Sequence, residues 1–321
     1  MRAVLTDADA ACMEAFSFQY RRNTLYRRYC DLMNVDIASV RSPLDIPFLP
    51  VGFFKTQTLL ASDRPASLIF ESSGTTGEAR SRHHVARPDW YLESLTNGFI
   101  RSYGTMENYC FLCLLPDYRE RPGSSLAYMC RAFIERSRHP ISGFYLNDFM
   151  GLHRAMQELE ARNQPTILLG VTYSLLDFAD QFPMPLKHIR VMETGGMKGR
   201  RKELTRKEVH ETLCNRFQCA HIHSEYGMTE LLSQAYSFSG GLFHCPPWMR
   251  ILIRDETDPR NIQGTSAAPV RGAVNVIDLA NRFSCPFIAT DDAGILHPDG
   301  QFEILGRIDF SDIRGCSLLS I

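Results

Sequence analysis

The sequence lacks any long, uninterrupted apolar run. Its longest apolar stretch, residues 166–179, contains Asp177 and is too short to cross a bilayer. The N-terminal segment MRAVLTDADAACMEAF has no basic region followed by an apolar core, which a secretory signal peptide requires. These two absences argue against a membrane-spanning or secreted protein, so we expect a cytoplasmic chain without a membrane partner.

An excess of charge of one sign is also missing. Lys and Arg total 35 and Asp and Glu total 36, which gives a formal net charge of −1. Such a balanced chain has no overall field that would attract nucleic acid, and no nucleic-acid partner is expected. The basic run at residues 198–207 is short and contains Glu203.

Nothing in the sequence indicates a disulfide framework. The ten cysteines are scattered over 321 residues with no secretory signal before them, so we expect reduced thiols. Four potential metal ligands lie close together in the sequence, but their spacing matches no structural zinc pattern. These residues are Cys214, Cys219, His221 and His223.

What the sequence does contain is an alternation of apolar strands with helix-like segments. This order favours an α/β class with mainly parallel sheets flanked by helices. A serine, Asp148 and Thr205 are available as caps for three of the helices. We expect strands near residues 109–116, 165–172 and 188–196 and helices near 8–35, 90–104, 124–137, 148–163 and 205–217.

The pattern of apolar segments and turns in the sequence changes near Gly240. From there, turn clusters such as DETDPRNIQG and HPDGQ separate the apolar segments, and no helical pattern lies between them. We therefore predict a smaller antiparallel β region at about 240–309 within one α/β core of residues 1–309. Residues 310–321 are predicted to form a short C-terminal tail.

A Ser/Thr/Gly loop, Ser72–Gly77, follows an apolar strand. Its hydroxyls, its glycines and its backbone N–H groups could wrap phosphate oxygens, and Arg80 and Arg82 could add charge-assisted contacts. The loop is not a Walker A motif because no GK[ST] sequence occurs. Composition alone favours an ordinary Ser/Gly turn over a phosphate site.

The segment Tyr226–Glu230 and the acidic turn at Asp292 suggest the remaining parts of a nucleotide site. A tyrosine can stack on a base, and a glutamate can hold Mg²⁺ among oxygen ligands. An acidic residue at the end of a strand can bind ribose hydroxyls. Each feature also has a structural explanation, such as a buried tyrosine or a glutamate at a helix start.

The stretches SSGTTGEAR, ETGG, YGMTE, TDDAG and GRID occur in this order within residues 72–309. Together they resemble the adenylate-forming superfamily of acyl-CoA synthetases, luciferases and peptide-synthetase adenylation domains. The resemblance implies ATP and Mg²⁺ as cofactors, with Tyr226 on adenine and Glu230 as the metal ligand. Asp291 stands where the superfamily usually has glycine, so either Asp291 or Asp292 could bind the ribose. The implied nucleotide-binding residues are Ser72, Ser73, Gly74, Thr75, Thr76, Gly77, Arg80, Gly195, Gly196, Tyr226, Gly227, Thr229, Asp292 and Arg307.

A narrower resemblance covers most of the chain after about residue 48. The segments SSGTTGEARSRHHV, LLPDYRERPGSSLAYM, ETGGMKGRRKELTRKEVH, SEYGMTELLSQAY and RGCSLL look like the LuxE-type acyl-protein synthetases, close to the phenylacetate–CoA ligase branch. That family activates a fatty acid as acyl-AMP and transfers the acyl group to a cysteine near its own C-terminus. By resemblance this cysteine is Cys316, and the neighbouring Arg314 could lower its pKa. The acyl group would then pass to an acceptor protein such as a LuxC-type reductase or another acyl carrier.

The sequence departs from the wider superfamily after Asp309. Other members continue there with a small domain that supplies a catalytic lysine, whereas twelve residues follow here. We expect this lid to be lacking and Lys198 to supply the cation, with Arg200 and Arg201 as weaker candidates. A solvated lysine in a basic loop is an equal alternative for Lys198.

Two other functions remain open at this stage. The chain could be a truncated carboxylate–CoA ligase, or a nucleotide-binding module without catalytic activity. The acid is not specified either, because Phe111–Leu115 and Thr166–Val171 could line an acyl pocket or form ordinary buried strands. Long-chain, medium-chain and aryl acids therefore all remain candidates.

Overall fold

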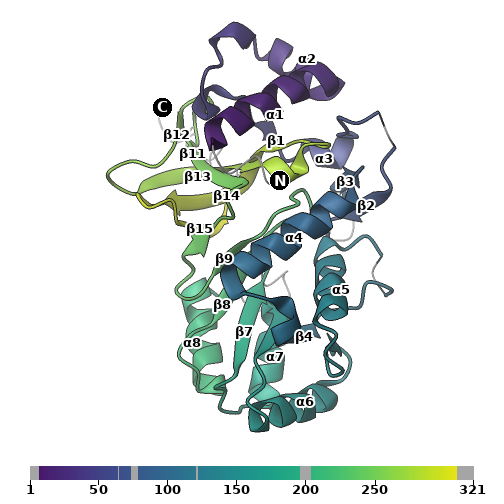
Figure 1. Cartoon of the computed structure of the whole chain (residues 1–321). Coiled ribbons are helices and arrows are strands. Elements are labelled where there is room, and N and C mark those ends of the chain that lie inside the picture. Colours follow the sequence, from purple (N-terminus) through teal and green to yellow (C-terminus); the bar gives the residue numbers. More distant parts are fainter. Residues whose placement is uncertain (1–6, 64, 74–78, 121, 196–203, 309–321) are drawn as a thin grey trace.

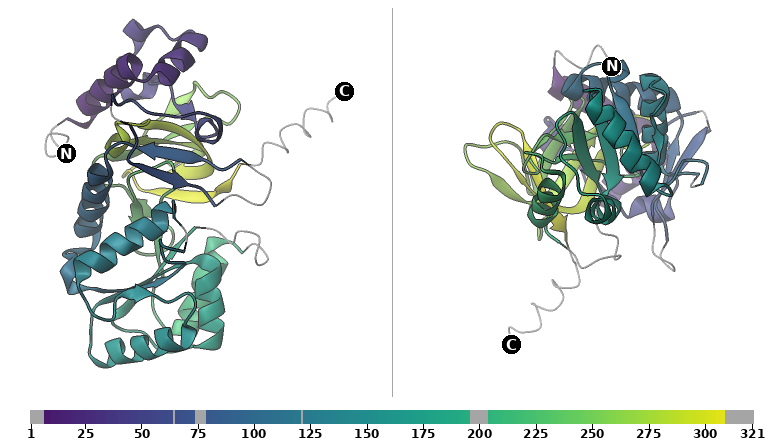
Figure 2. Two further views of the ribbon diagram at one scale, coloured as in Figure 1. Left: turned by 90° about the vertical axis from the view of Figure 1, so that its right-hand side faces the viewer. Right: turned by 90° about the horizontal axis from the view of Figure 1, so that it is seen from below.

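A computed structural model of the chain describes residues 7–63, 65–73, 79–120, 122–195 and 204–308. Along its long axis, two N-terminal helices lie at one end, antiparallel strands follow, and a half with parallel strands and most of the helices lies at the other end (Figures 1 and 2). Within the described residues, no helix is long and apolar enough to cross a bilayer.

One large sheet runs through both halves of the molecule. Its parallel part has the strand order β5-β4-β6-β7-β8. The predicted strands of the α/β half are all present. The strands expected near 109–116, 165–172 and 188–196 are β4 (Cys110–Leu114), β6 (Thr166–Val171) and β7 (Ile189–Thr194), and the parallel part also contains β5 (Gly143–Phe144) and β8 (His223–Tyr226).

The same sheet continues as antiparallel strands beyond β8. The pairing order is β8-β9-β10-β15-β14-β13-β11-β12, so the two halves share one hydrogen-bonded ladder. These strands are β9 (Ala235–Ser237), β10 (Phe243–His244), β11 (Met249–Arg254), β12 (Ile262–Gln263), β13 (Val270–Asp278), β14 (Phe287–Leu296) and β15 (Phe302–Arg307).

Helices cover both faces of the parallel part. In β4, Phe111 and Cys113 pack toward α4 and α5, whereas Cys110 and Leu112 pack toward α6, α7 and α8. Burial on both faces explains why such strands read as nearly continuous apolar runs. The helices are α4 (Pro88–Tyr103), α5 (Ser125–Ser137), α6 (Phe149–Ala161), α7 (Thr172–Gln181) and α8 (Arg206–Phe217).

The predicted helix caps are present. The side chains of Ser124, Asp148 and Thr205 accept hydrogen bonds from the first turns of α5, α6 and α8. Thr205 also forms a capping box with Glu208. The cap at Thr205 fixes the start of α8, which brings Arg206 to the edge of the sheet.

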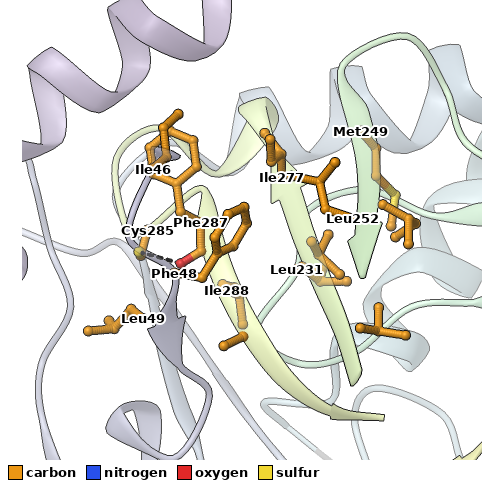
Figure 3. Packing of buried hydrophobic residues seen from close by; sticks show 14 of the residues in the cluster. Ile46, Phe48, Leu49, Leu231, Met249, Leu252, Ile277, Cys285, Phe287 and Ile288 are labelled. Carbon is orange, nitrogen blue, oxygen red and sulfur yellow. Dashed lines mark hydrogen bonds between the residues drawn. The ribbon is translucent and has the colours of Figure 1, made fainter. Parts of the chain in front are cut away.

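The N-terminal segment packs on the antiparallel strands (Figure 3). Ile46, Phe48 and Leu49 join Phe287 and Ile288 in one buried cluster. The short strand β1 pairs in parallel with β14 and places Leu49 opposite Ile288. This segment contains α1 (Ala8–Arg22), α2 (Thr24–Leu32), β1 (Leu49–Pro50), α3 (Phe53–Thr56) and 3₁₀ turns at Ile37–Ser39 and Pro43–Asp45.

A separate two-stranded hairpin carries the Ser/Thr/Gly loop. Strands β2 (Leu68–Glu71) and β3 (Arg82–Val85) pair antiparallel, with Phe70 opposite His83. The loop therefore joins two strands rather than leading from a strand into a helix. Two further 3₁₀ turns, Met106–Asn108 and Leu279–Asn281, lie elsewhere in the chain.

Candidate functional site

The predicted nucleotide-binding segments come from the β2–β3 hairpin and from the ends of β7, β8, β14 and β15. Gly195 follows β7, and Tyr226 is the last residue of β8. In α/β sheets, ligands bind beyond the carboxyl ends of the parallel strands. The site therefore lies where the parallel strands give way to the antiparallel ones.

The base of the 72–81 loop is closed by two hydrogen bonds. The backbone N–H of Ser72 donates to the Ser81 carbonyl over 3.1 Å, and the Ser81 N–H donates to Ser72 Oγ over 3.0 Å. Ser73 and Arg80 are exposed beside this closure. Arg82 instead pairs with Glu71 across the hairpin, with Nε 3.1 Å from Oε1.

Tyr226, Asp292 and Arg307 come together although they are far apart in the sequence. The Tyr226 hydroxyl donates to Asp292 Oδ2 over 2.8 Å, and Asp292 lies opposite Arg307 in the β14–β15 ladder. Burial raises the pKa of Asp292, and the Tyr226 hydrogen bond and the charge of Arg307 oppose that rise. Of the two adjacent acids, Asp292 is therefore the one beside Tyr226.

The ring of Tyr226 is buried against two phenylalanines. Its centroid lies 5.9 Å from that of Phe243 and 5.5 Å from that of Phe302, both in edge-to-face geometry. The hydroxyl is directed at Asp292 by this packing. Stacking of Tyr226 on adenine stays a prediction.

Glu230 is a buried carboxyl group, 5% exposed, at the turn that follows β8. Burial raises its pKa, while a hydrogen bond with Ser81 and the nearby charge of Arg307 lower it. The β2–β3 hairpin therefore lies beside Glu230 at Ser81. Thr229 is half-buried and Gly227 is exposed at the same turn.

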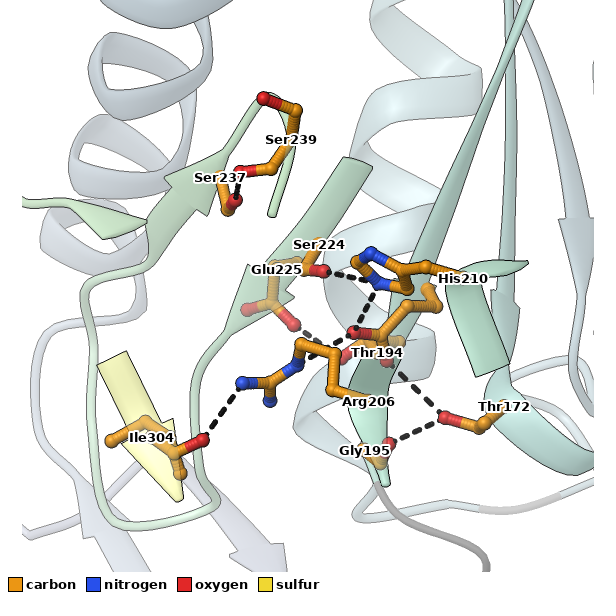
Figure 4. A network of polar contacts seen from close by, with 11 residues as sticks. Thr172, Thr194, Gly195, Arg206, His210, Ser224, Glu225, Ser237, Ser239 and Ile304 are labelled. Carbon is orange, nitrogen blue, oxygen red and sulfur yellow. Dashed lines mark hydrogen bonds and ion pairs between the residues drawn. The ribbon is translucent and has the colours of Figure 1, made fainter. Parts of the chain in front are cut away.

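A polar network that the sequence did not reveal holds the end of β7 (Figure 4). The Thr172 hydroxyl donates to the Gly195 carbonyl over 2.7 Å and lies 3.2 Å from Glu193. Arg206 Nε approaches Glu193 Oε1 at 3.2 Å, and His210 Nε2 approaches the same oxygen at 3.5 Å. Although burial opposes it, the pKa of Glu193 is lowered by these two groups and by Ser224.

Arg206 also reaches the antiparallel half. Its Nη1 donates to the Ile304 carbonyl over 2.9 Å, and its guanidinium lies 5.1 Å from the centroid of the Phe243 ring. The charge of Arg206 contributes to the electrostatics of Asp292. It is therefore a cation of the described site that sequence reasoning missed, because within the basic run at 198–207 the resemblance pointed to Lys198 instead.

Glu225, in β8 next to β7, is a further buried carboxyl group beside this network. The Thr194 hydroxyl donates to its Oε2 atom. Burial raises the pKa of Glu225 to about 7. Within the described residues, no group of three or more His, Cys, Asp or Glu side chains is arranged to hold a metal ion.

Several predicted residues lie outside the part of the chain that the structure describes. They belong to the Ser72–Gly77 loop, the ETGG stretch, the basic run at residues 198–207 and the C-terminal tail. These residues are Gly74, Thr75, Thr76, Gly77, Gly196, Lys198, Arg200, Arg201, Arg314 and Cys316.

Comparison with known proteins gives two curated relatives and no matching protein-family model. Both relatives are long-chain-fatty-acid–luciferin-component ligases, one from Aliivibrio fischeri and one from Vibrio harveyi, and each is 24% identical to this chain. The first alignment covers 97% of this chain and 86% of the relative, and the second covers 95% and 84%. The predicted resemblance to acyl-protein synthetases is confirmed at the level of sequence similarity.

Solved structures confirm the predicted adenylate-forming fold. An open 2-hydroxyisobutyryl-CoA ligase with 2-HIB-AMP and CoA matches with a TM-score of 0.63 at 14% identity, covering 94% of this chain and 74% of that one. ATP-bound MatB from Rhodopseudomonas palustris matches with a TM-score of 0.53 at 18% identity, covering 77% and 49%. At these identities the likeness concerns the fold alone.

Proposed function

We propose that this chain is a cytoplasmic ATP-dependent ligase that converts a fatty or other carboxylic acid into its acyl-AMP. The observation that carries the proposal is the meeting of Tyr226, Asp292 and Arg307 with Glu230 at the base of the phosphate-loop hairpin. Two relatives similar over nearly the whole chain are named long-chain-fatty-acid ligases. Fold, motifs and relatives therefore all support acid activation.

In the first step, a carboxylate oxygen attacks the α-phosphorus of ATP. A new P–O bond forms, the bond from the α-phosphorus to the bridging oxygen breaks, and pyrophosphate leaves. Because charge develops on phosphate oxygens, the protein contributes positioning and electrostatic stabilisation. Asp292 would bind the ribose, Arg307 would face ribose or phosphate, and Lys198 would supply a cation for the phosphate oxygens.

Glu230 fits a magnesium ligand by its chemistry. It is a buried carboxyl group at the phosphate side of the site, next to Ser81. Mg²⁺ is commonly held by one or two carboxylates together with substrate phosphates, so a cage of several protein ligands is not required. When bound, Mg²⁺ would neutralise charge on the phosphate oxygens.

In the second step, the thiolate of Cys316 would attack the acyl carbonyl carbon of the acyl-AMP. A C–S bond forms, the C–O bond to AMP breaks, and AMP leaves. Cysteine is a strong nucleophile even when a small fraction is ionised. This step rests on the sequence resemblance, as does onward transfer to an acceptor such as a reductase or acyl carrier.

Intact-protein mass spectrometry tests both steps. The chain is incubated with ATP, Mg²⁺ and a panel of long-chain, medium-chain and aryl acids. We expect one acyl adduct that hydroxylamine removes and that Cys316→Ala abolishes. Cys219→Ala, a partly exposed cysteine beyond α8, is the matched control and should retain the adduct.

Other outcomes would replace the proposal. Formation of an acyl-CoA thioester without a protein adduct would make the chain a carboxylate–CoA ligase. Binding of ATP without acid-dependent ATP–pyrophosphate exchange would make it a nucleotide-binding module.

A further inference from the structure

Side chains from two distant segments hold the turn that follows Tyr226. Nδ1 of His83, in β3, lies 2.8 Å from the Thr229 carbonyl oxygen. Nδ2 of Asn281, in the 3₁₀ turn Leu279–Asn281, donates to the Glu230 carbonyl over 2.8 Å. The two side chains also meet, with His83 Nε2 2.9 Å from Asn281 Oδ1, and both are fully buried.

The residue that caps the same 3₁₀ turn, Asp278 at the end of β13, holds the chain just beyond Glu230. Asp278 accepts the Leu232 backbone N–H over 2.7 Å and the Ser233 hydroxyl over 2.6 Å. Asn281 also donates to the Cys285 carbonyl over 3.0 Å, which ties it to its own segment. Because buried backbone groups require partners, these side chains fix the path of the turn.

His83 also couples the turn to the phosphate loop. It lies in β3 two positions after Ser81, which closes the 72–81 loop through its backbone. The Ser81 side chain lies near the Glu230 carboxyl and helps to lower its pKa. Both ends of Glu230, its carbonyl and its carboxyl, thus depend on groups whose positions the hairpin helps to set.

We propose that His83 and Asn281 are positioning residues that set the Thr229–Glu230 backbone for MgATP. The inference rests on the proposed function for the identity of the ligand. The two residues act through the carbonyls of Thr229 and Glu230. This assignment gives a role to His83 of the SRHHV segment, which the nucleotide motifs leave unexplained.

Binding of nucleotide to the full chain tests the inference without catalysis. ATP is titrated calorimetrically in the presence of Mg²⁺ and, separately, in EDTA. His83→Phe keeps a flat ring but removes both polar contacts, and Asn281→Asp removes the donors to both carbonyls. We expect both variants to bind MgATP about tenfold more weakly, the effect of losing about one buried hydrogen bond, and to bind ATP in EDTA nearly as wild type does.

Asn23→Asp is the matched control. Asn23 is also a buried amide that donates to a backbone carbonyl, that of Ser284 over 3.1 Å, but it belongs to the N-terminal segment. The Asn23→Asp variant should have a lower melting temperature than wild type and an unchanged affinity for MgATP. His83→Asn, which keeps an amide donor, is a milder variant and should bind MgATP more tightly than His83→Phe.

Folded His83 and Asn281 variants with wild-type affinity for MgATP would overturn the inference, since a merely structural role changes stability alone. Equal losses of ATP affinity in Mg²⁺ and in EDTA would also contradict it, because the two residues would then not act on the binding of the Mg²⁺ complex in particular. If wild type binds no MgATP at all, the proposed function fails, and the inference fails with it.

Discussion

At the scale of single residues, the pKa values of Glu193 and Glu225 are shifted in opposite directions although the two residues lie on neighbouring strands. Glu193 faces Arg206 and His210, and its pKa is lowered. Glu225 accepts a hydrogen bond from the Thr194 hydroxyl, and burial raises its pKa to about 7. Partners, rather than depth of burial, determine which of the two carboxyl groups carries charge at neutral pH.

The raised pKa of Glu225 predicts a pH-dependent stability. Because the folded pKa exceeds the ordinary value of about 4.3, Glu225 stabilises the fold fully below that pH and loses its contribution as pH rises through about 7. The free energy of unfolding of Glu225→Gln minus that of wild type should therefore be about 1–3 kcal/mol larger at pH 8 than at pH 5. Urea unfolding at both pH values measures this, and an unchanged difference would contradict it. Glu135→Gln, on the surface of α5, is the control.

At the scale of elements, the register of β14 and β15 aligns Asp292 with Arg307. Gly294 allows the two strands to approach, because a Cβ atom there would lie 2.6 Å from the Glu303 carbonyl oxygen and 2.8 Å from Val274. A bulge between Ala293 and Gly294 adjusts the same ladder. The geometry of the acid–arginine pair therefore depends on a position that carries no side chain.

Gly294→Ala should separate β14 from β15 and destabilise the fold by about 1–3 kcal/mol. Weaker ATP binding should accompany the loss, because Arg307 would move relative to Asp292. Gly98→Ala is the matched control: no atom lies within 4 Å of a Cβ there, and Gly98 is in α4. The free energy of unfolding of this control should rise by about 0.4–1 kcal/mol, mainly because the unfolded chain loses conformational entropy. Melting curves of the two variants should shift in opposite directions.

At the scale of the whole molecule, Arg206 joins the two halves of the sheet. It contacts Glu193 at the end of β7 and the Ile304 carbonyl of β15. Arg206→Met keeps much of the apolar stem but leaves the buried Glu193 without its guanidinium. We expect a loss of about 2 kcal/mol in the free energy of unfolding. Urea unfolding measures it, and Arg216→Met, whose ion pair with Asp180 is exposed, should change stability little.

The α/β alternation, the strands of the parallel half and three helix caps could be predicted from the sequence, because local period and capping chemistry encode them. The continuous sheet could not, because it depends on strand pairings between distant segments, such as Phe243 of β10 with Phe302 of β15, 59 positions apart. Ser81, His83 and Arg206 look like ordinary polar residues in the sequence. Their contacts arise only when the hairpin and α8 meet strands from elsewhere in the chain, and motif matching does not reach such positions.

The docking of the N-terminal segment on β14 has a consequence for synthesis. Leu49 pairs with Ile288, Gln19 donates to the Arg282 carbonyl, and Ala61 donates to the Phe283 carbonyl. This segment is synthesised well before its partners in β14, so it can pair with them only after about residue 290 has emerged, although the parallel half can assemble earlier. Until then, the apolar residues of α1 and α2 lack the strands that bury them, and such transiently exposed apolar surface favours aggregation during folding.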